Sequence, residues 1–136
     1  RARRFYTAED DGLSLPWRAS RLWCNPPFGS AGDGTSRLAK WVGKLLKEHE
    51  AGHVKQAVLL VRAATNALWF APLWKFPMCF HRGRPPYIPG PGVPREAPSI
   101  PTVLVGLGVD PAAFTRAFSE FGQVVIPEGK GIGRGL

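Results

Sequence analysis

The tetrapeptide Asn25-Pro26-Pro27-Phe28 directly follows a short apolar run over residues 21–24. An Asn side-chain oxygen and a neighbouring backbone carbonyl can both accept hydrogen bonds from an exocyclic amine, and so aim its lone pair at an electrophilic methyl group. Proline suits the second acceptor because it has a free carbonyl and no N–H, and two prolines stiffen the turn. An aromatic ring such as Phe28 can stack on a base swung out of a duplex. These residue types predict a grip on the amino group of a nucleic-acid base.

The alternative for this tetrapeptide is an ordinary turn, since Asn and Pro are the commonest turn residues and Phe28 can simply be core. Its position favours the chemical role. Pro cannot donate to a sheet ladder, so a strand over 21–24 must end at Asn25. The carboxyl ends of strands are where open α/β sheets bind their ligands.

The elements that would position this motif alternate between strand and helix. Apolar residues at helical spacing predict a helix over 36–49, and the unbroken apolar run 57–61 is typical of a strand buried on both faces of a parallel sheet. Thr65 or Asn66 is expected to cap a short helix that reaches Leu73, and Asp110 a helix over 112–121. Further strands are expected over 78–81, 102–107 and 123–126. We therefore predict an α/β fold with a mostly parallel sheet flanked by helices.

Composition bounds the class of protein. The 136 residues are 44% hydrophobic, which fits one domain over 1–128, followed by a flexible Gly-rich tail over 129–136. A formal charge of +8 favours a polyanionic partner, with nucleic acid first. Cys24 and Cys79 form no spaced cluster and are expected to be reduced core residues. There is no apolar run of membrane-spanning length and no signal peptide, so we expect an intracellular protein.

Several segments together resemble a known family. Asp11-Gly12-Leu13, then Trp17, then residues 22–29 with the Asn-Pro-Pro-Phe core look like the phage-type Dam family of DNA adenine-N6 methyltransferases. Trp41, residues 58–65, Trp69-Phe70, Arg82-Gly83-Arg84 and the strand after Thr102 continue in the family's order, so the resemblance spans most of residues 5–107. It implies a partial class I (Rossmann-like) S-adenosylmethionine-dependent methyltransferase fold. It also implies methyl transfer from S-adenosylmethionine to adenine N6 in DNA, with no metal.

The resemblance assigns roles to individual residues. Asn25 and Pro26 would hold the amine, Phe28 would stack on the base, and Asp11 would contact the cofactor adenine. Asp11 can equally be a solvated turn acid. The arginines that follow two expected strands would meet DNA phosphates, with a solvated basic rim as the alternative. These arginines are Arg62, Arg82 and Arg84.

The sequence also departs from the family. Arg62-Ala63-Ala64 stands where the family usually shows Pro-Ala, and Phe28 replaces the more usual Tyr. The family binds the methionine end of its cofactor on an earlier strand that nothing before Arg1 supplies, so the chain is expected to be N-terminally truncated. Two alternatives to DNA methylation stay open. One is a non-catalytic, nucleic-acid-binding remnant, and the other is a methyltransferase acting on RNA or on a protein glutamine.

Overall fold

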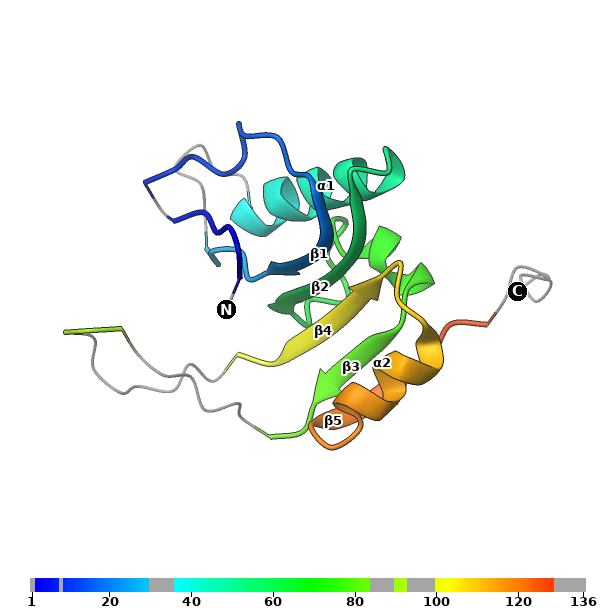
Figure 1. Ribbon diagram of the computed structural model, residues 1–136. Coiled ribbons are helices and arrows are strands. Elements are labelled where there is room, and N and C mark those ends of the chain that lie inside the picture. The colour runs from blue at the N-terminus through cyan, green and yellow to red at the C-terminus, as the bar shows by residue number, and fades with distance from the viewer. Residues whose placement is uncertain (1, 8, 30–35, 84–89, 93–99, 129–136) are drawn as a thin grey trace.

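A computed structural model describes residues 2–7, 9–29, 36–83, 90–92 and 100–128 of the chain. Five strands form one sheet in the order β1-β2-β4-β3-β5, with two helices against it (Figure 1). The strands are β1 (Ala19–Cys24), β2 (Val54–Arg62), β3 (Met78–His81), β4 (Thr102–Leu107) and β5 (Gly122–Val125). The helices are α1 (Arg37–Glu50) and α2 (Pro111–Phe118), and a short 3-10 helix, η1, covers Ala71–Lys75. None of the helices in the described ranges is long and apolar enough to cross a membrane.

The α/β class is confirmed, but the prediction of a mostly parallel sheet is wrong. Only β1 and β2 pair in parallel, whereas β2–β4, β3–β4 and β3–β5 are antiparallel. The central strand β4 runs opposite to its neighbours β2 and β3, and the edge strand β5 runs opposite to β3, although β1, β2 and β3 share one direction. An unbroken apolar run indicates that a strand is buried on both faces; it carries no information on strand direction.

One face of the sheet packs against α1 and η1 and carries the larger core. Alternate residues of β2 point into it, among them Ala57, Leu59 and Val61, and β4 contributes Val103 and Val105. The α1 side of this core is Leu38, Val42 and Leu45, which recur at helical spacing and are all buried. The helix predicted over 36–49 is therefore confirmed within a residue at each end, with Ser36 as its N-cap.

The opposite face packs against α2 over a smaller core of Leu60, Cys79, Leu104 and Phe114. Close approach of α2 depends on Gly106, because a Cβ placed there would lie 2.8 Å from the Phe114 ring. The predicted cap Asp110 is confirmed, since its Oδ2 accepts a hydrogen bond from the Ala113 backbone N–H at 2.9 Å. This second core is smaller because α2 has only eight residues, whereas α1 has fourteen.

The short helix predicted from Thr65 or Asn66 to Leu73 is wrong in its extent. Residues 65–70 form turns, and the 3-10 helix η1 begins only at Ala71. Pro72 explains the difference, because a proline has no N–H to donate and clashes with the preceding turn of a longer α-helix. The buried residues of this segment, Phe70 and Leu73, still pack into the larger core.

Candidate functional site

One edge of the sheet collects most of the residues that the sequence singled out. Because β1, β2 and β3 run in one direction, their carboxyl ends lie at the same edge, and β4 begins there. The Asn-Pro-Pro-Phe motif follows β1, Arg62 ends β2, and Arg82 follows β3. Arg62 pairs directly with Thr102 at the start of β4. The structure thus brings the motif, Arg62 and Arg82 to one edge, while Arg84 and the tail 129–136 lie outside the described residues.

Within the motif the four residues alternate between exposed and buried. Asn25 and Pro27 are exposed, Pro26 is buried, and Phe28 is half-buried against the larger core. The Asn25 side-chain amide makes no hydrogen bond to the described part of the chain. Turn-forming asparagines often bond their side chain to nearby backbone, and within the described residues Asn25 does not. The Asn25 amide is therefore open to an external donor, and Phe28 is partly exposed beside it.

The turn after the motif fixes it to α1. Gly29 has a φ of 102°, in the region that favours glycine, and its carbonyl accepts a hydrogen bond from the Arg37 N–H at 3.0 Å. That N–H is one of the donors at the helix start that lack an intrahelical partner. Since β1 holds the motif on one side and α1 on the other, the backbone around Asn25 is constrained at both ends.

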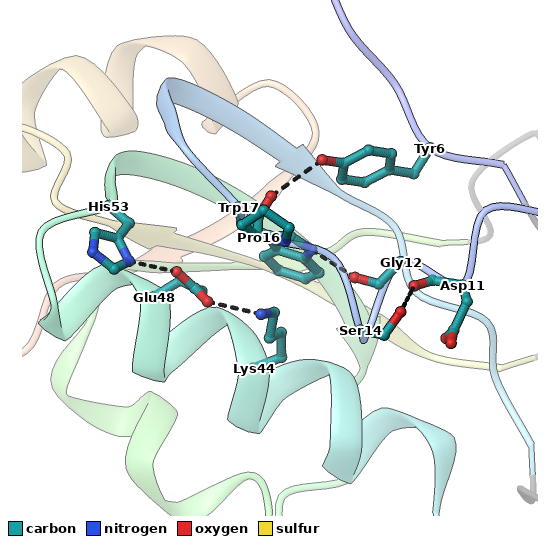
Figure 2. Close-up of polar contacts among 9 residues, drawn as sticks. All are labelled: Tyr6, Asp11, Gly12, Ser14, Pro16, Trp17, Lys44, Glu48 and His53. Atoms are coloured by element: carbon teal, nitrogen blue, oxygen red, sulfur yellow. Dashed lines mark hydrogen bonds and ion pairs between the residues drawn. The ribbon is translucent and has the colours of Figure 1, made fainter.

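Asp11 lies in a strained loop. Its φ of 44° is unusual for a residue other than glycine, and its carbonyl accepts hydrogen bonds from both the N–H and the hydroxyl of Ser14, each at 3.0 Å. Figure 2 shows the Asp11 carboxylate pointing away from these bonds. The side chain is exposed, so the loop presents a free carboxylate on a fixed backbone.

Trp17 fastens this loop to α1, which the sequence did not predict beyond Trp17 being part of the family likeness. Its indole N–H donates to the Gly12 carbonyl at 2.8 Å (Figure 2). Its ring is buried, and the ring centroid lies 5.8 Å from that of Trp41. Gly12 must be glycine, because a Cβ there would lie 2.8 Å from the Trp41 ring. The Asp-Gly pair and a later Trp are therefore explained by one packed contact between loop and helix.

A charged cluster on α1 lies beside Trp17. Lys44 Nζ lies 5.7 Å from the Trp17 ring and donates to Glu48 Oε1 at 2.7 Å, while His53 Nδ1 lies 2.8 Å from Glu48 Oε2 (Figure 2). The hydrogen bond from Lys44, followed by that from His53, lowers the pKa of the Glu48 carboxyl. These contacts link α1 to His53, which lies between α1 and β2.

Three polar side chains on the α2 face of the same edge have no partner. Arg62 Nε, Thr102 Oγ1 and His81 Nδ1 are each buried and make no hydrogen bond in the described structure. Arg62 was predicted from the sequence as a DNA contact, whereas Thr102 and His81 were not. The available signal was that each is a polar residue at the end of an otherwise apolar strand.

The two cysteines are free and buried, as predicted. Burial raises the pKa of the Cys24 thiol to about 12, and burial also raises the pKa of the Cys79 thiol, against a smaller opposing effect of Arg82. Both thiols are therefore protonated and inert as nucleophiles at neutral pH. No group of three or more potential metal-ligating side chains is found within the described ranges.

Comparison with known families gives one match. The model of the DNA N-6-adenine-methyltransferase (Dam) family matches residues 1–91, which is about two thirds of the chain. The matched region contains Asp11, the Asn-Pro-Pro-Phe motif, Arg62 and Arg82, and it ends before β4. Comparison with curated proteins and with solved structures gives no match.

Proposed function

The chain belongs to the Dam family of DNA N-6-adenine-methyltransferases, and from this we propose that it transfers a methyl group from S-adenosylmethionine to the N6 amine of adenine in DNA. The observation that carries the proposal is the exposed Asn25 amide, which has no partner in the described chain and stands at the carboxyl edge of the sheet. This is the group that the chemistry requires, at the edge where such sheets bind ligands.

The work of the motif follows from the weakness of the nucleophile. The lone pair of an exocyclic adenine amine is delocalised into the ring, so the amine reacts only if it is held in a productive orientation. The Asn25 side-chain oxygen and the Pro26 carbonyl would each accept a hydrogen bond from one N–H of the adenine amine. Pro27 would stiffen the turn, and the free side of Phe28 would stack on a base swung out of the duplex.

The Asp11 loop fits a role in holding the cofactor. Its carboxylate is exposed on a backbone that two hydrogen bonds from Ser14 hold in a strained conformation, and such strain is common at ligand sites. A carboxylate accepts hydrogen bonds, so Asp11 would hold the adenine amine of S-adenosylmethionine. When bound, this cofactor supplies the electrophilic methyl group.

Membership of the Dam family is the basis for proposing a class I methyltransferase fold. The strands β1, β2 and β3 share one direction, as the parallel strands of such a fold would, whereas β4 and β5 run opposite to them.

DNA as the substrate is supported by charge. The chain carries a formal charge of +8, and Arg62 and Arg82 lie at the motif's edge of the sheet. We assign these two arginines to backbone phosphates, which position a duplex without reading its sequence.

Methyl incorporation by the purified chain tests the proposal directly. With labelled S-adenosylmethionine and adenine-containing DNA, Asn25→Ala should lower kcat by on the order of 100-fold or more, because the amine loses its orientation. Asn25→Asp keeps an acceptor oxygen and should retain more activity than Asn25→Ala. Asn66→Ala removes an exposed asparagine from a turn and is the matched control. Full incorporation by Asn25→Ala would refute the site.

The same assay separates the two alternatives. If RNA or a glutamine peptide is labelled and DNA is not, the chain is a methyltransferase with a different methyl acceptor. Binding of DNA without incorporation, and without any rise in Tm on adding S-adenosylmethionine, would support a non-catalytic nucleic-acid-binding domain, because a ligand of the folded state must stabilise it.

A further inference from the structure

The three unpartnered side chains at the motif's edge lie in one row across three neighbouring strands. Arg62 of β2 and Thr102 of β4 are direct cross-strand partners. Phe80 pairs with Val103, so the next residue of β3, His81, lies level with Thr102. We refer to Arg62, Thr102 and His81 as the polar row.

The polar row extends the α2 face of the sheet. Two residues earlier or later along the same strands come Leu60, Leu104 and Cys79, which form the buried core beneath α2. Side chains two apart on a strand share a face. The row is therefore the polar continuation of an apolar surface, on the side of the sheet opposite α1.

Leaving three buried polar atoms unpaired is costly. Burial of an unsatisfied donor or acceptor is disfavoured, and nearly all such groups in folded proteins have a partner. Thr102 is only 3% exposed, so solvent does not pair its hydroxyl. Valine would pack in the same space without this cost. The polar atoms are thus best explained by a partner that is not part of the described chain.

The donor set defines that partner. The Arg62 guanidinium can only donate, the Thr102 hydroxyl can donate, and His81 Nδ1 donates in one neutral tautomer and in the charged ring. Three donors at one place match a group rich in acceptor oxygens, and Arg suits an oxyanion in particular. The half-buried Arg62 has a long, flexible side chain that can move to admit an oxygen, whereas Thr102 and His81 are fixed on strands.

Resting on the proposed function, we propose that the polar row binds a single phosphate of the DNA strand that carries the target adenine. The register places Asn25 immediately after the Cys24–Leu59 pair, so the motif lies at the end of β1 while Arg62 ends the adjacent strand β2. A phosphate held by Arg62, Thr102 and His81 would therefore lie beside the base that Asn25 grips. The carboxylate of S-adenosylmethionine presents the same chemistry, and the experiment below distinguishes the two sources.

The test removes one phosphate charge at a time. DNA duplexes with a single methylphosphonate at successive positions around the target adenine are titrated into the chain and into Thr102→Val. We expect a methylphosphonate at one position to lower the DNA affinity of the wild type about tenfold. Thr102→Val should bind unmodified DNA about tenfold more weakly than the wild type, and the methylphosphonate at that position should lower the affinity of this variant no further. Arg62→Gln should also lower the dependence of log K on log salt by about one unit, and Lys55→Gln, at the opposite end of β2, should leave the methylphosphonate pattern unchanged.

The other outcomes overturn the proposal in different ways. If the loss of DNA affinity caused by Thr102→Val adds to the loss caused by the methylphosphonate at every position, the polar row does not contact a phosphate. Weaker S-adenosylmethionine binding with unchanged DNA affinity would assign the row to the cofactor carboxylate. A higher Tm for Thr102→Val with both affinities unchanged would show that the hydroxyl has no ligand. If the wild type does not bind DNA, both the phosphate site and DNA as the substrate are refuted. If the chain methylates DNA but the affinity losses are additive at every position, only the phosphate site at the polar row is refuted.

Discussion

The two faces of the sheet differ in what occupies them. Among the described residues, the α1 face carries one cluster of fifteen buried residues, which joins the Trp17 loop, α1, η1 and the strands β1, β2, β3 and β4. The buried apolar cluster in the described part of the α2 face has four members, and at the motif's edge this apolar surface gives way to the polar row. On β1 this second face also leaves Trp23 59% exposed.

This difference separates stability from function. The α1 face is closed by apolar contacts and by the fastened Asp11 loop, so its residues are constrained by packing. The α2 face retains unpaired polar atoms that a sequence selected for stability alone would replace with apolar side chains. We infer that the core on the α1 face holds the motif and the Asp11 loop in place, while the polar row on the α2 face is kept for a ligand.

The largest effect should come from emptying the core on the α1 face. Phe70 is fully buried, with the rings of Trp69 and Trp74 at centroid distances of 5.7 and 5.1 Å. Phe70→Ala should lower the free energy of unfolding by about 3–5 kcal/mol, because the surrounding strands and η1 cannot collapse into the cavity. Urea unfolding measures the change.

Phe114→Ala is the matched variant on the α2 face. Phe114 is also buried, but it belongs to a helix of eight residues that can move toward the sheet. We expect a loss at or below the lower end of the same range, about 3 kcal/mol. An equal or greater loss at Phe114 would contradict the distinction between a closed face and an adaptable one.

The N-caps of the two helices should differ in how much they stabilise the fold, by less than the two cores do. Asp110 Oδ2 accepts from Ala113 at 2.9 Å, whereas Ser36 Oγ accepts from Ala39 at 3.4 Å. Asp110→Ala should cost about 1 kcal/mol and Ser36→Ala about 0.5 kcal/mol, because the shorter bond also places a negative charge at a helix N-terminus. Thermal unfolding checks the order, and Asp110→Asn should recover most of the loss. A larger cost at Ser36 would mean that α1, despite its apolar face, depends more on its cap than α2.

The order and type of elements were predictable because each has a local cause. Apolar spacing gave α1, Asp110-Pro111 gave the start of α2, and unbroken apolar runs gave β2 and β4. Strand direction and neighbour order depend on contacts between distant segments, so the place of β4 between β2 and β3 could not be predicted. The end of β1 at the motif was predictable because proline cannot donate to a sheet ladder, whereas the role of Asn25 stays a prediction, since Asn and Pro are also common turn residues.

The polar row was not predictable for the same reason. Arg62, His81 and Thr102 are separated by 19 and 21 positions in the sequence, and only the register places them side by side. Trp17 was noted only as part of a likeness to the family, because its hydrogen bond to Gly12 and its contact with Trp41 need the folded loop.

The smallest effect concerns charge on the outer side of α1. Because Lys44 and His53 lower the pKa of Glu48, its carboxylate stabilises the fold above the ordinary Glu pKa, and this contribution is lost as pH falls through the lowered value. Glu48→Gln should cost about 0.3–0.5 kcal/mol at pH 7, and the difference in stability between variant and wild type should shrink as pH falls below the ordinary Glu pKa. Glu50→Gln is the matched control, since Glu50 is exposed and its Oε1 lies 3.9 Å from Lys75 Nζ. Urea unfolding of the wild type and both variants at pH 7 and at acidic pH measures these differences in stability. A pH-independent cost at Glu48 would mean that its stem packs beside Trp17, and that the α1 face is held by apolar contact on its outer side as well.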